Sequence, residues 1–158
     1  MGRLIIDPDL CVACRNCLLA CAVDRHSLAK SLHGAQKESP QQPPRLRLDL
    51  YGKGSMPVHC RHCDPAPCIA ACPTWAMHRD EDGMVSYDDG ACIQCFMCVA
   101  SCPYGACWQS EDGARVLKCD MCPNREVPAC ADACPTGAIT YEQASSNESP
   151  DPAEVTHR

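Results

Sequence analysis

Short apolar runs separated by polar turns dominate this chain and predict small β-strands. Residues 4–6 (LII) form one run ahead of the first cysteine. Residues 45–50 (RLRLDL) alternate strictly between polar and apolar positions. This period of two predicts a strand with Leu46, Leu48 and Leu50 facing the core.

Residues 76–87 predict a β-hairpin, because two short apolar runs flank an Asp-Gly turn. Before it, residues 24–37 are expected to contain a short helix. The proline-rich stretch 39–44 is expected to be an extended linker. The polar tail, 142–158, is expected to be loosely ordered unless a partner holds it.

The composition limits what can hold such a chain together. It has 158 residues, a formal net charge of −6, and few bulky aromatic side chains: one Phe, two Trp and four Tyr. A chain of this length forms one domain or two small ones, and a core with so little bulk needs staples. The 17 cysteines are the obvious candidates.

Metal ligation is favoured over disulfides as the role of these cysteines. Residues 1–7 lead into the first cysteine without the apolar stretch of a secretory signal, and no run has the length of a membrane span. We therefore expect a cytoplasmic protein, in which thiols stay reduced and dense cysteine indicates metal. The odd count also leaves one cysteine outside any set of pairs.

Sixteen of the cysteines fall into four groups with similar spacing. In each group three cysteines come close together and the fourth follows after three residues, with Pro next in the last three groups. Bacterial ferredoxins have this arrangement: the first three cysteines hold one [4Fe–4S] cluster and the fourth ligates the other cluster. Structural zinc usually takes two close pairs, so a zinc-stapled scaffold is the weaker alternative. The groups are Cys11, Cys14, Cys17 and Cys21; Cys60, Cys63, Cys68 and Cys72; Cys92, Cys95, Cys98 and Cys102; and Cys119, Cys122, Cys130 and Cys134.

The predicted hairpin joins the second and third groups into one two-cluster unit. The outer groups repeat this design, because residues 4–11 resemble 85–92 and residues 134–139 resemble 72–77. The first and fourth groups therefore form a second unit, with the other inserted between them. Crossing within each unit gives four ligand sets, named here sites a to d. They are Cys11, Cys14, Cys17 and Cys134 (site a); Cys119, Cys122, Cys130 and Cys21 (site b); Cys60, Cys63, Cys68 and Cys102 (site c); and Cys92, Cys95, Cys98 and Cys72 (site d).

The chain resembles the four-cluster electron-transfer subunits of molybdenum or tungsten pterin oxidoreductases, hydrogenases and carbon monoxide dehydrogenase. The matching pieces are the four groups with residues 102–106 (CPYGA), 118–122 (KCDMC) and 134–138 (CPTGA). The resemblance implies an α+β fold of two fused ferredoxin-like units in pseudo-twofold relation, each a small antiparallel sheet with short helices. It also implies four [4Fe–4S] clusters and a non-catalytic subunit that only moves electrons.

The expected division of the chain follows from this pairing. It comprises an outer unit (1–23 plus 115–141), an inner unit (56–110), a connecting segment (24–55) and the tail (142–158).

The resemblance also implies partners. The expected ones are a catalytic oxidoreductase subunit, preferably a tungsten or molybdenum aldehyde or formate oxidoreductase, and a flavin or ferredoxin-type redox partner. Hydrogenase and carbon monoxide dehydrogenase are the alternatives. With clusters at both ends, copies could also stack into a wire, although one copy per catalytic subunit is the ordinary arrangement.

Five residues near the ligands have competing interpretations. Cys107 stands alone and is expected to be a small buried residue rather than a ligand or redox switch. His59 and His62 could form a Rieske-like set, but sixteen thiols already satisfy four clusters, so they are expected to line the site. Trp75 and Trp108 are expected to pack over clusters rather than relay electrons.

Trp75 also occupies the position that Gly137 has in the fourth group, so a different backbone is expected there.

The charge count suggests a role for the cations near the ligands. Arg15, Arg61, Lys118 and Arg125 lie within or beside the cysteine groups. Sixteen thiolates and four oxidised cluster cores would bring the formal charge from −6 to about −14. Nearby cations would offset that charge and raise reduction potentials. The acidic balance gives nucleic-acid binding no electrostatic basis.

Overall fold

The computed structural model describes residues 2–25, 27–38, 43–52 and 54–143. Most of the expected linker, and the tail from residue 144, lie outside the described residues. The elements are β1 (Arg3–Ile6), η1 (Pro8–Leu10), α1 (Asn16–Arg25), α2 (Leu32–Ala35), β2 (Arg47–Tyr51), β3 (Gly54–Val58), α3 (Pro67–Ala70), β4 (Met77–Arg79), β5 (Val85–Tyr87), α4 (Met97–Ser101), β6 (Cys107–Gln109), β7 (Val116–Lys118), α5 (Ala129–Asp132) and β8 (Ile139–Glu142).

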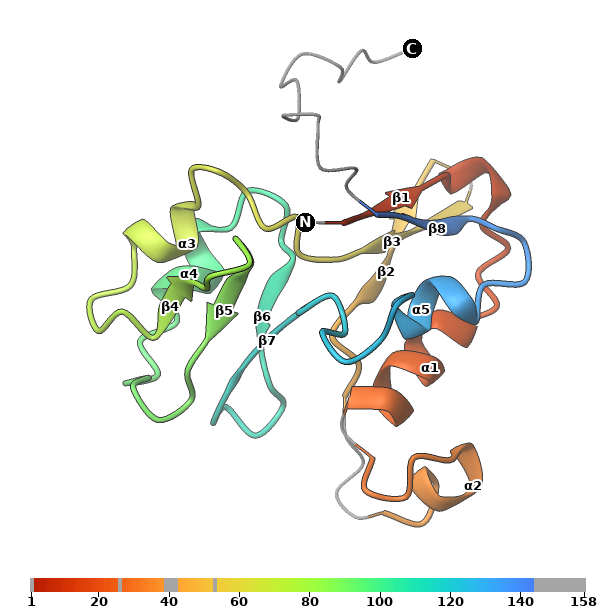
Figure 1. The fold of residues 1–158 in the computed structure, drawn as a ribbon, viewed down its shortest axis with the longest axis horizontal. Helices are drawn as coiled ribbons and strands as arrows, with labels where there is room; N and C mark the ends of the chain where they lie inside the picture. Colours follow the sequence, from red (N-terminus) through yellow and green to blue (C-terminus); the bar gives the residue numbers. More distant parts are fainter. Residues whose placement is uncertain (1, 26, 39–42, 53, 144–158) are drawn as a thin grey trace.

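In the described ranges the strands form four two-stranded antiparallel sheets: β1–β8, β2–β3, β4–β5 and β6–β7. One half of the molecule contains β1, β8, β2 and β3 with α1 and α5, and the other contains β4 and β5 with α3 and α4 (Figure 1). The β6–β7 hairpin lies between them. The fold is therefore α+β, with short helices and small sheets.

Two separate cores match these halves. The first joins residues from both ends of the chain with Leu46: its other buried members are Leu4, Cys17, Cys21, Cys130 and Ile139. The second contains only residues from the middle of the chain: Ala66, Met77, Val85, Cys98, Cys107 and Val116. Cysteines make up a large share of both cores, so their sulfur atoms fill space that aromatic side chains fill in many other proteins.

The strand predictions near the cysteines are confirmed. β1 pairs with β8, with Leu4 opposite Tyr141, so the leading and trailing strands meet across the whole chain. β4 and β5 form the predicted hairpin. Its turn is held by the Asp80 carboxylate, which accepts a hydrogen bond from the Met84 N–H at 2.8 Å, and by Gly83 at φ +82°. Glycine suits this turn because it adopts positive φ without steric cost.

Other predictions were less complete. The strand expected at 45–50 begins at Arg47, and Leu46 and Leu48 pack in the first core as expected, whereas the Leu50 side chain lies outside the described residues. The helix expected within 24–37 is only the single turn α2, because α1 already ends at Arg25. β3 was not predicted, and neither was the β6–β7 hairpin, which spans the expected boundary between the inner and outer units.

Candidate metal centres

Site a surrounds a cavity between the first and fourth cysteine groups. Its walls are otherwise mostly apolar and include Leu48 and Ile139. The Cys11 sulfur lies 3.5 Å from the Ser55 hydroxyl of β3, so the connecting segment also reaches this site. Four thiols line the cavity, three from the first group and one from the fourth: Cys11, Cys14, Cys17 and Cys134.

Site c has the same construction in the other half. Its cavity is lined by Met77 and Val85 from the β4–β5 hairpin, and by Lys118 at the end of β7. Three thiols from the second group and one from the third face it: Cys60, Cys63, Cys68 and Cys102. In both cavities the fourth cysteine comes from the partner group, as the crossing rule predicts.

Site b is the most buried set. Its thiols lie close enough to affect one another electrostatically, and all four are buried: Cys21, Cys119, Cys122 and Cys130. Burial raises the pKa of Cys21 and of Cys119 to about 12, because the charged thiolate is disfavoured away from water.

Two of the four thiols of site d lie at the second core. Cys98 belongs to the second core and Cys72 packs against that core. Cys92 is half-buried and Cys95 is exposed. This ligand set is the one that the crossing rule predicts.

Backbone N–H groups point at several of these sulfurs, as they do in iron–sulfur proteins, where hydrogen bonds to sulfur help to set the potential. The sulfur acceptors are Cys21 (from Arg45 N, 3.2 Å), Cys72 (Met77 N, 3.4 Å), Cys92 (Gln94 N, 3.3 Å), Cys102 (Ala106 N, 3.3 Å) and Cys119 (Met121 N, 3.4 Å). The first group lacks the Cys-Pro turn. The connecting segment replaces it there, through the Arg45 N–H.

The thiol arrangement fits a cluster. Each iron of a cubane takes one thiolate, so four thiolates surround a volume instead of converging on a point. Within the described ranges, no three His, Cys, Asp or Glu side chains are placed to hold a single metal ion.

The three Cys-Pro groups share a backbone feature that the sequence did not predict. The third residue after the cysteine has positive φ in each: Trp75 (+60°), Gly105 (+56°) and Gly137 (+70°). The difference expected between Trp75 and Gly137 was therefore wrong. The alanine that follows is almost fully buried in all three, which leaves the chain little freedom at this turn.

The two histidines bind backbone groups. His62 is buried, and its Nδ1 accepts a hydrogen bond from the Val85 N–H at 3.0 Å. The Nδ1 of His59 lies 2.9 Å from the Cys60 carbonyl. Burial lowers the pKa of His62 to about 3, and the nearby Lys118 charge adds to the effect, so the ring is neutral.

Cys107 is buried, as expected, and lies between two sites. It lines the cavity of site c, and its thiol donates a hydrogen bond to the Cys98 sulfur, which lowers the pKa of Cys98 to about 7. The two tryptophans differ in exposure. Trp75 is 72% exposed, whereas Trp108 is half-buried and lies beneath the Arg47 guanidinium, 5.9 Å from the ring centre.

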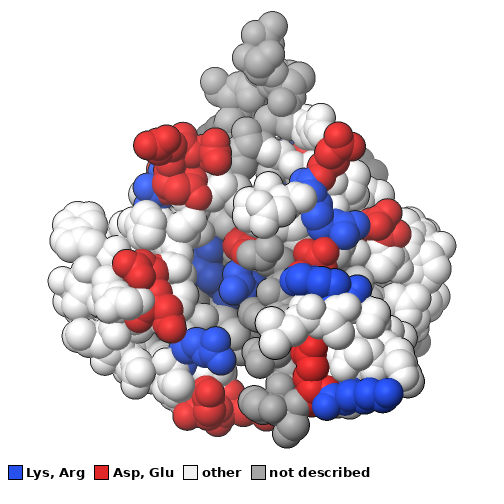
Figure 2. All heavy atoms as spheres, turned by 60° about the horizontal axis from the view of Figure 1, so that its bottom comes forward, with Lys and Arg blue, Asp and Glu red and all other residues white. Residues whose placement is uncertain are grey.

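The cations near the ligands divide into two kinds. Arg125 is exposed and forms ion pairs with Asp24 and Asp132. Arg61 is also exposed; it stacks on the Tyr104 ring at 4.2 Å and lines the cavity of site c. Lys118 is buried, with only 4% of its surface exposed. Figure 2 shows acidic and basic side chains interspersed over one face, without a field of a single sign.

Comparison with known proteins decides between zinc and iron–sulfur chemistry. Residues 54–144 match the model of the 4Fe-4S dicluster domain, which spans more than half of the chain. The chain belongs to this family. The zinc scaffold is therefore set aside, and the chain is an iron–sulfur protein that binds [4Fe–4S] clusters.

Full-length relatives agree with this assignment. YsaA of Escherichia coli (strain K12) is 38% identical over 143 residues, which cover 88% of each protein. The thiosulfate reductase electron transfer subunit PhsB of Salmonella typhi is 31% identical, covering 92% of this chain and 77% of the relative. A polysulfide reductase subunit of Wolinella succinogenes is 32% identical, covering 92% of this chain and 78% of the relative. The chain is accordingly a non-catalytic electron-transfer subunit of an oxidoreductase complex.

The fold also has a counterpart among solved structures. One subunit in the active-site complex BamBC of benzoyl coenzyme A reductase superimposes with a TM-score of 0.50 at 20% identity, covering 94% of this chain and 82% of that subunit. This likeness concerns the fold alone. Over the described residues, no helix is long and apolar enough to cross a membrane.

Proposed function

We propose that the chain relays single electrons through four [4Fe–4S] clusters held at sites a to d. The observation that carries the proposal is the mixed origin of the two cavities. Thiols of the first and fourth groups surround one cavity, and thiols of the second and third groups surround the other. This crossing is what two ferredoxin-like units, one inserted in the other, require. The two cores support the same division into units.

The chain's own residues hold the clusters, shield them and give access to them. Each bound cluster supplies a centre that gains or loses one electron. Apolar walls keep water away from sites a and c, and backbone N–H groups donate to thiolate sulfurs. Cys14 at site a and Cys95 at site d are the two exposed ligands, and they belong to different halves of the molecule. Electrons therefore enter and leave at sites a and d.

The partner is a catalytic oxidoreductase subunit, because relatives named as subunits of thiosulfate and polysulfide reductases align over more than nine-tenths of this chain. The finer proposal is that this partner is a molybdenum- or tungsten-dependent enzyme. It is either an aldehyde or formate oxidoreductase or a reductase of sulfur compounds. A flavin or ferredoxin-type protein is the second partner.

Metal analysis of the protein purified without oxygen tests the number of clusters. We expect about sixteen iron and sixteen sulfide ions per chain. About half that amount, with the signals of only two clusters, would contradict the four-cluster relay. Purification of the tagged chain with its partner, followed by tungsten and molybdenum analysis, tests the partner. A catalytic subunit without either metal would overturn that part.

A further inference from the structure

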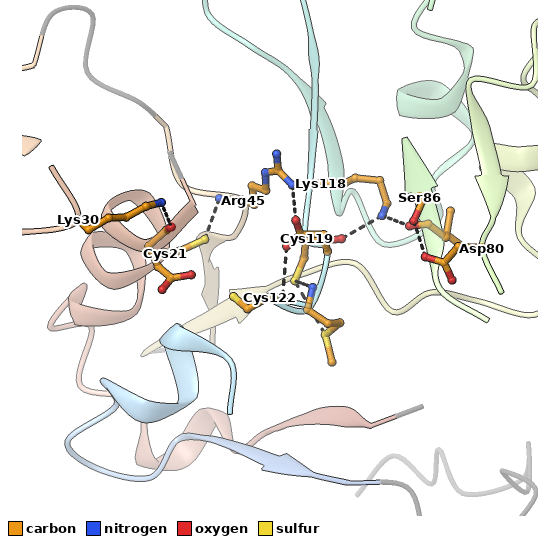
Figure 3. Close-up of polar contacts among 12 residues, drawn as sticks. Cys21, Lys30, Arg45, Asp80, Ser86, Lys118, Cys119 and Cys122 are labelled. Carbon is orange, nitrogen blue, oxygen red and sulfur yellow. Dashed lines mark hydrogen bonds and ion pairs between the residues drawn. The ribbon is translucent and has the colours of Figure 1, made fainter. Parts of the chain in front are cut away.

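Lys118 is a buried cation at the centre of the molecule. Its Nζ donates hydrogen bonds to the Val85 carbonyl of β5 and to the Cys119 carbonyl, the latter at 2.9 Å (Figure 3). Both acceptors are backbone carbonyls, which carry no net charge. A lysine ammonium is rarely buried so completely, because leaving water is costly unless a negative group compensates.

Lys118 borders two of the proposed sites at once. Its side chain lines the cavity of site c, and it also affects the Cys68 thiol electrostatically. The next residue along the chain is Cys119, a buried ligand of site b. Site b belongs to one half of the molecule and site c to the other, so Lys118 lies where an electron would cross between the halves.

His62 holds the same strand residue from the other side. The Val85 N–H donates to His62 Nδ1, while the Val85 carbonyl accepts from Lys118. Because Nδ1 is the acceptor, the ring proton is on Nε2. This atom is buried and has no hydrogen-bond partner among the described residues.

We propose that Lys118 tunes the electron-transfer step between the two halves, by raising the reduction potential of the cluster at site c. A positive charge beside a cluster stabilises the added electron, and burial leaves that charge poorly screened. His62 keeps Val85, and with it the Lys118 ammonium, in place. The cluster at site c is therefore a better electron acceptor than it would be without this charge. The inference rests on the proposed function, because it requires a cluster at site c.

The test is a redox titration followed by electron paramagnetic resonance on the fully loaded Lys118→Met chain. Methionine keeps most of the length and removes the charge. Lys37→Met, at an exposed lysine, is the matched control. The signal of site c is identified as the one lost in Cys102→Ser. We expect its midpoint potential to fall in Lys118→Met and to be unchanged in Lys37→Met, with Lys118→Arg close to wild type.

Unchanged potentials in a loaded Lys118→Met chain would overturn the proposal. If Lys118→Met does not bind its clusters, Lys118→Gln is measured instead. A wild-type potential at site c in Lys118→Gln would also overturn the proposal. Failure of the Met, Gln and Arg variants alike to bind iron would show a purely structural residue. The iron content of the wild-type chain is measured separately. This measurement distinguishes a missing cluster at site c from a cluster whose potential does not depend on Lys118.

Discussion

Trp75 and Gly137 hold the same left-handed backbone, at φ +60° and +70°, in equivalent turns after Cys72 and Cys134. Glycine adopts this conformation freely, whereas a bulky side chain there is strained by about 1–3 kcal/mol. The Trp75 ring is 72% exposed, so contacts within the chain do not offset much of this strain. An exposed aromatic ring beside a proposed ligand of site d is well placed to contact a partner protein.

Trp75→Gly is therefore expected to raise the stability of the loaded chain by about 1 kcal/mol and to slow electron transfer to its partner. Thermal unfolding of the holoprotein and single-turnover transfer measure the two effects. Leu28→Gly removes another highly exposed apolar side chain, 93% exposed, and serves as the control. A less stable Trp75→Gly chain would show that the positive φ does not strain Trp75. An unchanged rate of electron transfer would show that Trp75 does not contact the partner protein.

Cys102→Ser is expected to damage the cluster held by Cys60, Cys63 and Cys68, and to spare the cluster of its own group. The reason is its position in the wall of the site c cavity. The spectrum of Cys102→Ser should match that of Cys60→Ser. A match with Cys92→Ser would instead mean that the third group keeps its own fourth cysteine, and the crossed assignment would be wrong.

The sequence predicted the features that depend on local pattern. The strand before Cys11, the hairpin at 76–87 and the grouping of the thiols all follow from spacing within a dozen residues. The two cavities bring together the thiols that the crossing rule paired. This lining supports the crossed assignment at sites a and c, and the ligand sets stay a prediction that the Cys102→Ser spectra test.

Features that depend on distant packing were missed. β3 has the sequence GSMPV, which lacks alternation and contains Pro57, so only its pairing with β2 reveals a strand. The burial of Lys118 also depends on Val85, which is 33 residues away. The backbone at Trp75 is imposed by the turn around Cys72 and the buried Ala76, which override the preference of the residue itself.

Iron binding is expected to strengthen as the pH rises from about 6.5 to about 8.5. Burial raises the pKa of Cys17 to about 11 and that of Cys21 to about 12, so both thiols are protonated wherever the metal-free chain keeps this packing. In an unfolded metal-free chain, thiols have their ordinary pKa of about 8.5, and most of them are protonated over the lower part of this pH range. Iron binds the thiolate, and each such thiol must release a proton. Each thiol that must lose a proton raises the affinity for iron by up to about tenfold per pH unit. This dependence holds while the pH stays well below the pKa of that thiol. Chelator competition at three pH values measures the slope, and a flat profile would contradict protonated thiols.

Removal of the clusters is expected to abolish the cooperative fold. Cys17, Cys21 and Cys130 are half of the buried members of the first core, and Cys98 and Cys107 belong to the second. Without metal, thiols that the clusters had cross-linked must be buried with only a few aliphatic neighbours, and this apolar area is too small to offset the entropy of ordering the chain.

Chelation under reducing conditions should therefore remove most far-UV circular dichroism and leave no sharp thermal transition. Reconstitution with iron and sulfide should restore both, which separates unfolding from chemical damage. A metal-free chain that still melts cooperatively would show that the apolar core alone specifies the fold.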